Sequence, residues 1–168
     1  MQTNTLPTMN MDTSETGCCP KFVSEGWDGT QIEFQDKRFA RAETRSFMHF
    51  PLNIGGVFKR VNEKIVAENA SMKDSYFVLS HDLSPWKGEH YFAVEKDIPG
   101  EEMVNMSGSF LTKVFEGPFQ NVGKWSEEMK RYVESNGKKV KKRYFFYTTC
   151  PKCAKTFGKN FVVAFAQV

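Results

Sequence analysis

The sequence predicts an α+β protein of two tandem βαββ repeats. We expect a pseudo-twofold relation between them, one antiparallel sheet, two helices on one face and an open groove on the other. A short pattern around a proline occurs twice, at Pro51 and at Pro118. Tyr76 opens an aromatic strand pattern 25 residues after Pro51, and Tyr144 does the same 26 residues after Pro118. An apolar stripe with helical spacing lies between proline and tyrosine in both copies, and such self-similarity indicates a duplication.

The first repeat covers about residues 37–99. Its expected elements, in chain order, are a strand at about Arg38–Phe50, a helix at Ile54–Ala70, and strands at Ser75–Ser80 and His90–Lys96. Pro51 ends the first strand because it lacks a backbone donor. Asn53 precedes the apolar stripe and is expected to cap the helix with its side chain. The stripe itself has the one-sided spacing of an amphipathic helix: Ile54, Val57, Phe58, Val61, Ile65 and Val66.

The second repeat covers about residues 100–168. Its expected elements are a strand at about Met106–Glu116, a helix at Val122–Ser135, and strands at Lys142–Thr148 and Lys159–Ala166. Asn136-Gly137 provides a residue pair suited to the left-handed conformation that ends many helices. The turn that links the repeats, Ile98-Pro99-Gly100, is short, so we expect the repeats to pack directly. A groove between such halves is a common place for a small ligand.

The N-terminal 36 residues are less regular. Residues 1–17 are polar and without periodicity, and we expect a disordered tail before a domain at 18–168. Trp27-Asp28-Gly29-Thr30 predicts a turn, and Gln31–Phe34 with Lys37–Ala42 is expected to form a short hairpin. The tail lacks the apolar centre of a signal peptide, and no apolar run is long enough to span a membrane, so the expected location is the cytoplasm.

Charge and composition restrict the classes of partner that we expect for this protein. The net charge is +3, from 23 basic and 20 acidic residues, which is too balanced to predict nucleic-acid binding. The one dense basic run, Lys138–Arg143, is better explained as the solvated flank of a strand pair. The 16 phenylalanines indicate either a thick aromatic core or an aromatic-lined cavity. The expected partner is therefore a small molecule, neither nucleic acid nor a membrane, and a protein partner is not specified.

The turn Val114-Phe115-Glu116-Gly117-Pro118-Phe119, the helix with Trp125, its Asn136-Gly137 end and the aromatic strand Tyr144–Tyr147 resemble the GyrI-like small-molecule-binding, or effector-binding, family. The resemblance covers roughly residues 37–168. It implies a tandem βαββ fold whose central groove binds bulky aromatic molecules, in one branch with hydrolytic opening of a cyclopropane ring in genotoxic natural products, a detoxification. Chains with the Cys-Cys-Pro-Lys-Phe start, here residues 18–22, and the Cys-Pro-Lys-Cys loop, here 150–153, resemble a subgroup often labelled hydrolase.

Two departures from the family pattern bear on function. Members commonly carry a glutamate in the aromatic strand of the second half, whereas Tyr144–Tyr147 holds no carboxylate, so selectivity for cationic ligands is not expected. No helix-turn-helix precedes the domain, which disfavours a transcription factor. Two function classes remain open: a hydrolase, and a non-catalytic module that binds a ligand or regulates a partner.

Three residues are candidates for acid–base work, which a hydrolase needs in order to activate water. Glu116 ends a strand beside a turn, although a solvated strand-end acid has the same pattern. His49 occupies nearly the equivalent position in the first repeat, so the two side chains are hypothesised to share proton transfer across one groove. Glu95 lies in the predicted apolar strand, where alternation puts it on one face with Tyr91 and Ala93; its alternative is the exposed face of that strand.

Aromatic side chains are the candidate walls of the ligand site, and some of them are expected to be core instead. The predicted ligand-binding set is Tyr91, Trp125, Tyr144, Phe146, Tyr147 and Trp86. Flat rings in this set favour a planar aromatic ligand.

The four cysteines indicate no cofactor. Cys150 and Cys153 form a single Cys-x-x-Cys pair, whereas a structural zinc site requires two such pairs or equivalent ligands. Cys18 and Cys19 are adjacent, and successive side chains diverge, so we expect no metal. A redox pair is disfavoured because the motif falls in a strand–strand loop and not at a helix start. Haem is not expected either, since no histidine lies on an apolar helical face.

Overall fold

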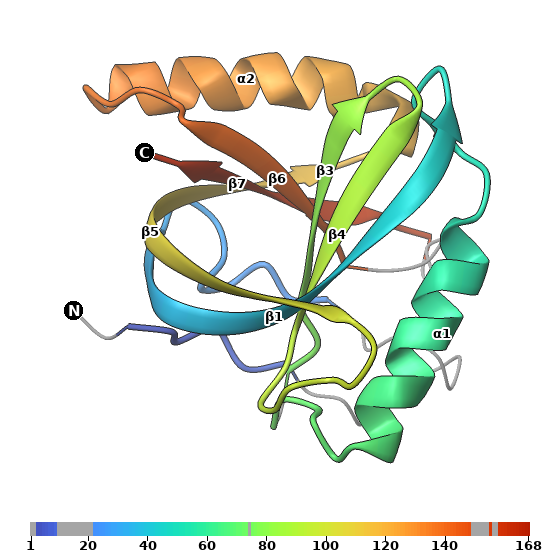
Figure 1. The fold of residues 1–168 in the computed structure, drawn as a ribbon. Coiled ribbons are helices and arrows are strands. Elements are labelled where there is room, and N and C mark those ends of the chain that lie inside the picture. Colours follow the sequence, from blue (N-terminus) through green and yellow to red (C-terminus); the bar gives the residue numbers. More distant parts are fainter. Residues whose placement is uncertain (1–2, 10–21, 74, 149–154, 156–157) are drawn as a thin grey trace. The chain divides into compact units, whose positions relative to one another are not determined.

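The computed structural model describes residues 3–9, 22–73, 75–148, 155 and 158–168. The fold is α+β, with two α-helices and antiparallel strand pairs that join β1 to β4, β4 to β3, β5 to β7 and β6 to β7. The chain divides into two compact units, residues 36–106 and residues 1–35 with 107–168. Figure 1 shows the elements along the chain, and each unit is described by itself. Among the described residues, no helix has the length and apolar content needed to cross a lipid bilayer.

The unit of residues 36–106 contains the first strand–helix–strand–strand series. Its elements are β1 (Gln31–Phe47, from Asp36 onward), β2 (Phe50–Pro51), α1 (Ile54–Ala67), β3 (Val78–Ser84) and β4 (Lys87–Ala93). Strand β4 lies between β1 and β3: Tyr91 is opposite Arg41 on one side and Leu79 on the other. The last strand of the series is therefore central, which places its alternate residues on both faces of the small sheet.

Helix α1 covers one face of this sheet through the predicted stripe. Val57, Val61 and Ile65 are buried and pack in one cluster with Ala42 and Phe92 of the strands. Burying each such side chain contributes roughly 1.5–3 kcal/mol. Val66 is 68% exposed, so the stripe is narrower than the sequence indicates. Helix α1 is confirmed, although it ends at Ala67 and not near Ala70.

Asn53 sits at the N-cap position of α1, but the predicted side-chain cap is wrong. The Asn53 side chain makes no capping hydrogen bond. Its Oδ1 instead accepts a hydrogen bond from the backbone N–H of Arg45, at 2.7 Å. The same polar side chain can bond either its own helix or a neighbouring strand, and here the strand provides the donor.

The second unit repeats the order of elements. Its strands and helices are β5 (Glu102–Glu116, from Ser107 onward), the short 3₁₀-helix η2 (Phe119–Asn121), α2 (Val122–Ser135), β6 (Lys142–Tyr147) and β7 (Phe161–Gln167). Strand β7 lies between β5 and β6, so the last strand is again central. The two units thus share chain order and strand order. Superposition of the units as pseudo-twofold repeats stays a prediction.

Helix α2 is confirmed with its predicted bounds and its predicted end. Trp125, Met129 and Val133 are buried on the face that meets β5, β6 and β7. Gly137 has a φ of +71°, and the N–H of Lys138 donates to the carbonyl of Val133 at 3.2 Å. This is the hydrogen-bond pattern of a left-handed helix stop, for which glycine has no side-chain penalty.

The N-terminal segment belongs to the second unit. Within the described residues 3–9, which fall in the segment predicted to be a disordered tail, the backbone N–H of Asn4 donates to the carbonyl of Glu33 at 2.8 Å. Trp27 is only 2% exposed, and its ring lies 5.4 Å from that of Phe146. The predicted hairpin after Trp27 is wrong: Gln31–Phe47 is one strand, which continues through Asp36 although Asp36 has a φ of +50°.

Candidate functional site

The turn after β5 is built around a glycine. Glu116 is the last residue of β5, Gly117 has a φ of +144°, and Pro118 is extended before η2 begins. A Cβ atom at Gly117 would lie 3.3 Å from the side chains of Asn121 and Trp125. Both the backbone angle and the available space therefore require glycine here. The sequence places Glu116 next to a turn whose backbone is fixed by its neighbours.

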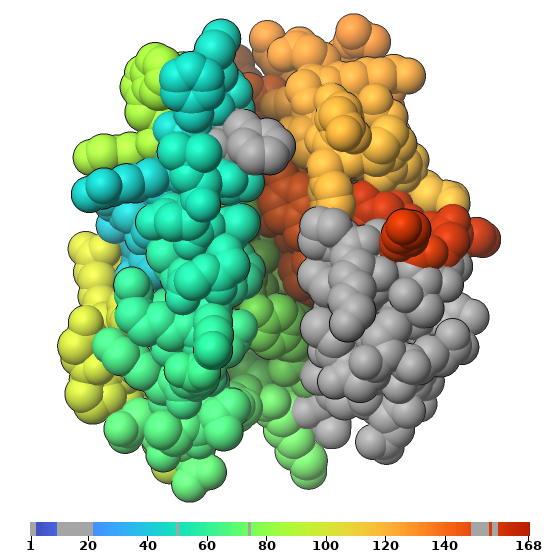
Figure 2. All heavy atoms as spheres, turned by 90° about the vertical axis from the view of Figure 1, so that its right-hand side faces the viewer, coloured from blue at the N-terminus to red at the C-terminus, as the bar shows by residue number. Residues whose placement is uncertain are grey.

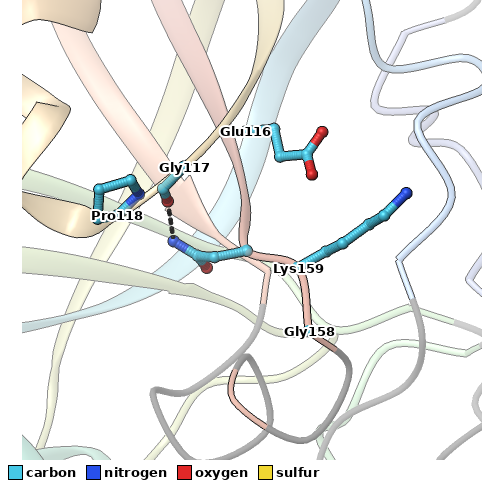
Figure 3. Close-up of a pocket in the computed structure, with 6 residues that line it drawn as sticks. Glu116, Gly117, Pro118, Gly158 and Lys159 are labelled. Carbon is cyan, nitrogen blue, oxygen red and sulfur yellow. Dashed lines mark hydrogen bonds between the residues drawn. The ribbon is translucent and has the colours of Figure 1, made fainter.

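A shallow cavity of about 280 Å³ opens beside this turn. Its lining residues come from the turn and from the segment before β7: Glu116, Gly117, Pro118, Gly158, Lys159 and Asn160. All six belong to the unit of residues 1–35 and 107–168. Figure 3 shows the side chains of Glu116 and Lys159 extending to the same side, away from Pro118.

The charges in this cavity are suited to acid–base chemistry. Glu116 and Lys159 are both exposed, and within the described ranges they form no hydrogen bond or ion pair with each other. A carboxylate can accept a proton from water, and an ammonium can stabilise negative charge that develops on a substrate. The arrangement thus offers a base and a cation on one surface.

His49 and Asp82 form a second pair of polar side chains, in the unit of residues 36–106. Nδ1 of His49 lies 3.1 Å from Oδ2 of Asp82, and both side chains are 57% exposed. Met48 and His49 are the two residues of the β1–β2 turn and have φ values of +47° and +69°. A carboxylate on one ring nitrogen orients an imidazole and leaves the other nitrogen for proton transfer.

Exposed apolar side chains lie near His49 in the chain and on the neighbouring hairpin. Phe47, Met48 and Trp86 are 58%, 68% and 55% exposed, and the rings of Phe47 and Trp86 are 5.6 Å apart. Figures 1 and 2 show the ends of the β1–β2 and β3–β4 hairpins side by side. His49 and Glu116 fall in different units, so the hypothesis that they share proton transfer stays a prediction.

Glu95, the third predicted catalytic residue, lies beyond the end of β4 and is exposed. Its backbone N–H donates to the carbonyl of Ala70 at 2.8 Å. Burial lowers the pKa of Lys37, and attraction to Glu95 opposes that shift. The described contacts give Glu95 a role in fixing the chain after β4 and in partly compensating a half-buried lysine.

Most of the predicted aromatic ligand-binding residues are buried. Tyr91, Trp125, Tyr144 and Phe146 are 7%, 4%, 4% and 1% exposed. Trp125 stacks on Phe115 at 5.6 Å, in the core under α2. On the opposite face of the same strands, Phe146 packs against Trp27 of its own unit. Tyr147 is half-buried against Phe119, and Trp86 is exposed.

A buried charged group lies on the other unit's sheet. Arg41 bonds the carboxylates of Glu89, Glu43 and Glu102 at 2.8–2.9 Å. Burial disfavours the charged guanidinium, but these hydrogen bonds outweigh that effect and raise the pKa of Arg41. Glu89 is only 2% exposed. Because the charge of Glu89 is paired, this cluster is better suited to holding strands together than to chemistry.

Sequence reasoning missed the partners of both candidate groups. Lys159 and Asn160 lie 43 and 44 positions after Glu116, and Asp82 lies 33 after His49. No local pattern marks them, since strand pairing brings them into place. Within the described ranges, no group of three or more His, Cys, Asp or Glu side chains is arranged to hold a metal ion. The prediction about Cys18, Cys19, Cys150 and Cys153 lies outside the described residues.

Fold and site together define an α+β protein of two similarly connected units, with a cavity that combines a carboxylate, an ammonium and an amide. Residues 9–168 match the family model described as "Bacterial hydrolase", so the chain belongs to this bacterial hydrolase family. No curated protein matches the chain. The family agrees with the hydrolase label of the subgroup that the sequence resembles, whereas the substrate is not identified.

Proposed function

We propose that this chain hydrolyses an electrophilic aromatic small molecule in the cavity beside Glu116. The observation that carries the proposal is that Glu116 and Lys159 line one cavity in a member of a hydrolase family. Glu116 would act as the general base for water. Lys159 would stabilise the negative charge that forms on the substrate.

A cyclopropane conjugated to a carbonyl is the substrate class that we favour. The oxygen of water attacks a ring carbon while its proton passes to the Glu116 carboxylate. The ring C–C bond breaks, and its electron pair forms an enolate whose oxygen Lys159 stabilises. Glu116 then returns the proton to the enolate carbon. The net reaction adds one water across one carbon–carbon bond and leaves Glu116 ionised for the next turnover.

We further propose that the chain is related to GyrI-like proteins and that its two units arose by duplication. The shared order of elements, with a central last strand in each unit, supports this relation. Detoxification of a bulky planar compound would then be the biological role. The predicted groove walled by Tyr91, Tyr144 and Phe146 would need these buried rings to become accessible. Binding in the cavity beside Glu116 would not require any of these buried rings to become accessible.

The test is product formation, measured by mass spectrometry with a panel of cyclopropane-bearing aromatic compounds. Glu116→Gln keeps the shape of the side chain and removes the base, and should lower kcat/KM by about 10²–10⁴-fold. Lys159→Met should also slow turnover. Glu127→Gln, an exposed acid on α2, is the matched control and should retain activity.

Some results would contradict the assignment of catalysis to the cavity beside Glu116. Full activity of Glu116→Gln would exclude this cavity as the catalytic site, and loss of activity in His49→Gln alone would move the chemistry to the His49–Asp82 pair. Saturable binding without product, followed by intrinsic fluorescence, would instead support the alternative of a non-catalytic binding module.

A further inference from the structure

The ends of two neighbouring hairpins in the unit of residues 36–106 carry a group of exposed apolar side chains. Of the eight large apolar side chains that are exposed in the described part of the chain, five lie on or directly beside these ends, here called the hairpin tip: Phe47, Met48, Leu52, Leu83 and Trp86. Figure 2 shows the two hairpin ends side by side at the surface. Exposed apolar surface gathered in this way is typical of a site that contacts another molecule or a membrane.

Backbone hydrogen bonds join the two hairpin ends into one surface. The N–H of Ser46 donates to the Trp86 carbonyl at 2.7 Å, and the N–H of His49 donates to the Pro85 carbonyl at 2.8 Å. The rings of Phe47 and Trp86 are in contact with each other, at 5.6 Å, and each is still more than half exposed. Strand pairing therefore presents these rings to solvent together.

Two cations lie directly behind the hairpin tip. Arg45 and Lys87 are opposite each other in the β1–β4 pair, and both are exposed. Neither forms an ion pair with another described residue, because the nearby acids Glu43, Asp82 and Glu89 bond other side chains. Like charges directly opposite each other on paired strands repel. An anionic surface that contacts both cations would remove this repulsion.

The order of apolar and cationic groups matches the depth profile of a bilayer surface. Phe47 lies on the same face of β1 as Arg45, two positions nearer the tip, which is about 6.6 Å along a strand. Apolar protein surface enters the boundary between headgroups and acyl chains by roughly 5–10 Å, so the two cations would lie at the headgroups. A second copy of this chain fits less well, because a twofold contact through the tip would bring Arg45 and Lys87 of both copies toward each other.

We propose that the hairpin tip docks this protein on an anionic lipid membrane, with its apolar side chains at the acyl boundary and Arg45 and Lys87 against lipid phosphates. The sequence predicts no membrane partner, because it holds no apolar run long enough to span a bilayer. Binding at the surface requires only a few side chains that folding brings together. Trp86 is of the residue type that is enriched where membrane meets water.

The test is sedimentation of the full chain with lipid vesicles, made either of phosphatidylcholine alone or with about 30% phosphatidylglycerol. The wild-type protein should bind the anionic vesicles roughly 10- to 30-fold more tightly, since each basic residue near an anionic surface contributes about fivefold. Trp27 and Trp125 are 2% and 4% exposed, so a shift of tryptophan emission to shorter wavelength on binding should come from Trp86. Trp86→Phe should still sediment with the vesicles but should lose this shift.

Paired substitutions test the apolar part of the hairpin tip. Met48→Ser combined with Leu52→Ser should weaken binding to anionic vesicles by at least about tenfold, because two exposed apolar side chains can no longer leave water. Val23→Ser combined with Val66→Ser is the matched control. Val23 and Val66 are 65% and 68% exposed, and Met48 and Leu52 are 68% and 66% exposed, so the control removes equally exposed apolar side chains elsewhere. It should bind as the wild type does.

A second pair of variants tests the charges. Arg45→Gln combined with Lys87→Gln should abolish the preference for anionic vesicles. Lys73→Gln combined with Lys96→Gln removes two exposed cations from the same unit, away from the hairpin tip, and should retain most of the preference.

Circular dichroism verifies that each variant is folded. Absence of binding to anionic vesicles, equal binding to both kinds of vesicle, or equal effects of the tip and control variants would overturn the proposal. A dimer in analytical ultracentrifugation that Met48→Ser with Leu52→Ser converts to a monomer would overturn it too, because the tip would then bind a second copy. The assays require no turnover, so their result is independent of the proposed hydrolysis.

Discussion

Gly117 and Asn160 are joined by two hydrogen bonds that hold the end of β5 against the start of β7. The backbone N–H of Gly117 donates to the Asn160 carbonyl at 3.0 Å, and Nδ2 of Asn160 donates to the Gly117 carbonyl at 2.8 Å. Figure 3 shows the second of these bonds. Because Glu116 and Lys159 are the residues on either side of this link, it fixes the spacing between the two backbone positions that carry the base and the cation of the candidate site.

Replacing Gly117 with alanine should destabilise the protein by about 1–3 kcal/mol. The left-handed φ is strained for alanine, and the new Cβ would crowd Asn121 and Trp125. Urea denaturation measures the change. Gly123→Ala is the control: Gly123 lies in the first turn of α2 with nothing within 4 Å of its Cβ position, so alanine there should stabilise by about 0.5–1 kcal/mol. Equal effects of the two substitutions would contradict this account of the turn.

Replacing Trp125 with alanine tests whether its side chain belongs to the core or to a ligand site. Its ring stacks on Phe115 and is almost fully buried, so Trp125→Ala should lower the free energy of unfolding by about 3–5 kcal/mol. Trp86→Ala, at a position 55% exposed, should cost less than about 1 kcal/mol. Denaturant midpoints of the two variants provide the comparison. A stable Trp125→Ala protein that loses ligand affinity would instead support the ligand-binding prediction.

His90 should make stability depend on pH below neutrality. Its ring nitrogens lie 2.9 Å from Oγ1 of Thr44 and 2.7 Å from Oγ of Ser80. Burial lowers the pKa of His90 to about 4, and attraction to Glu89 opposes this shift. The unfolded chain therefore binds the proton more readily than the folded one. Stability from this group is complete above the ordinary histidine pKa of about 6.5, and is lost as pH falls toward 4, by at most about 3 kcal/mol.

The measurement is the free energy of unfolding at pH 7 and at pH 4.5, for the wild type and His90→Gln. Glutamine can bond both hydroxyl groups but does not titrate, so the variant should lose less stability on acidification. His81→Gln, outside this pair of hydroxyl groups, should keep the wild-type pH dependence. The same acid sensitivity in all three proteins would rule out His90 as its source.

Met48 occupies a strained position in the β1–β2 turn. A two-residue turn with positive φ at both positions favours asparagine or glycine, whereas methionine has no such preference. Met48→Asn should therefore stabilise the protein by about 0.5–1 kcal/mol while leaving the His49–Asp82 pair in place. Thermal and urea unfolding test the gain, with Met48→Leu as a neutral control. A less stable Met48→Asn would mean that the Met48 side chain makes packing contacts worth more than the backbone strain.

The sequence by itself determined the local elements of this protein. The spacing of Val57, Val61 and Ile65 determines the buried face of α1, and Asn136-Gly137 determines where α2 ends. These features depend on residues within one or two helical turns, so periodicity and backbone preference are sufficient to predict them. The placement of Glu116 at the end of a strand beside a turn was predictable for the same reason.

Tertiary structure alone decided which residues meet. Tyr144, Phe145 and Phe146 are all buried, so their strand has no polar face whose alternation could reveal which rings are core. The neighbours of Glu116 and His49 come from strands and turns more than 30 positions away in the chain. Such contacts depend on strand register and helix packing, which are set by the burial of the whole fold and not by any local stretch.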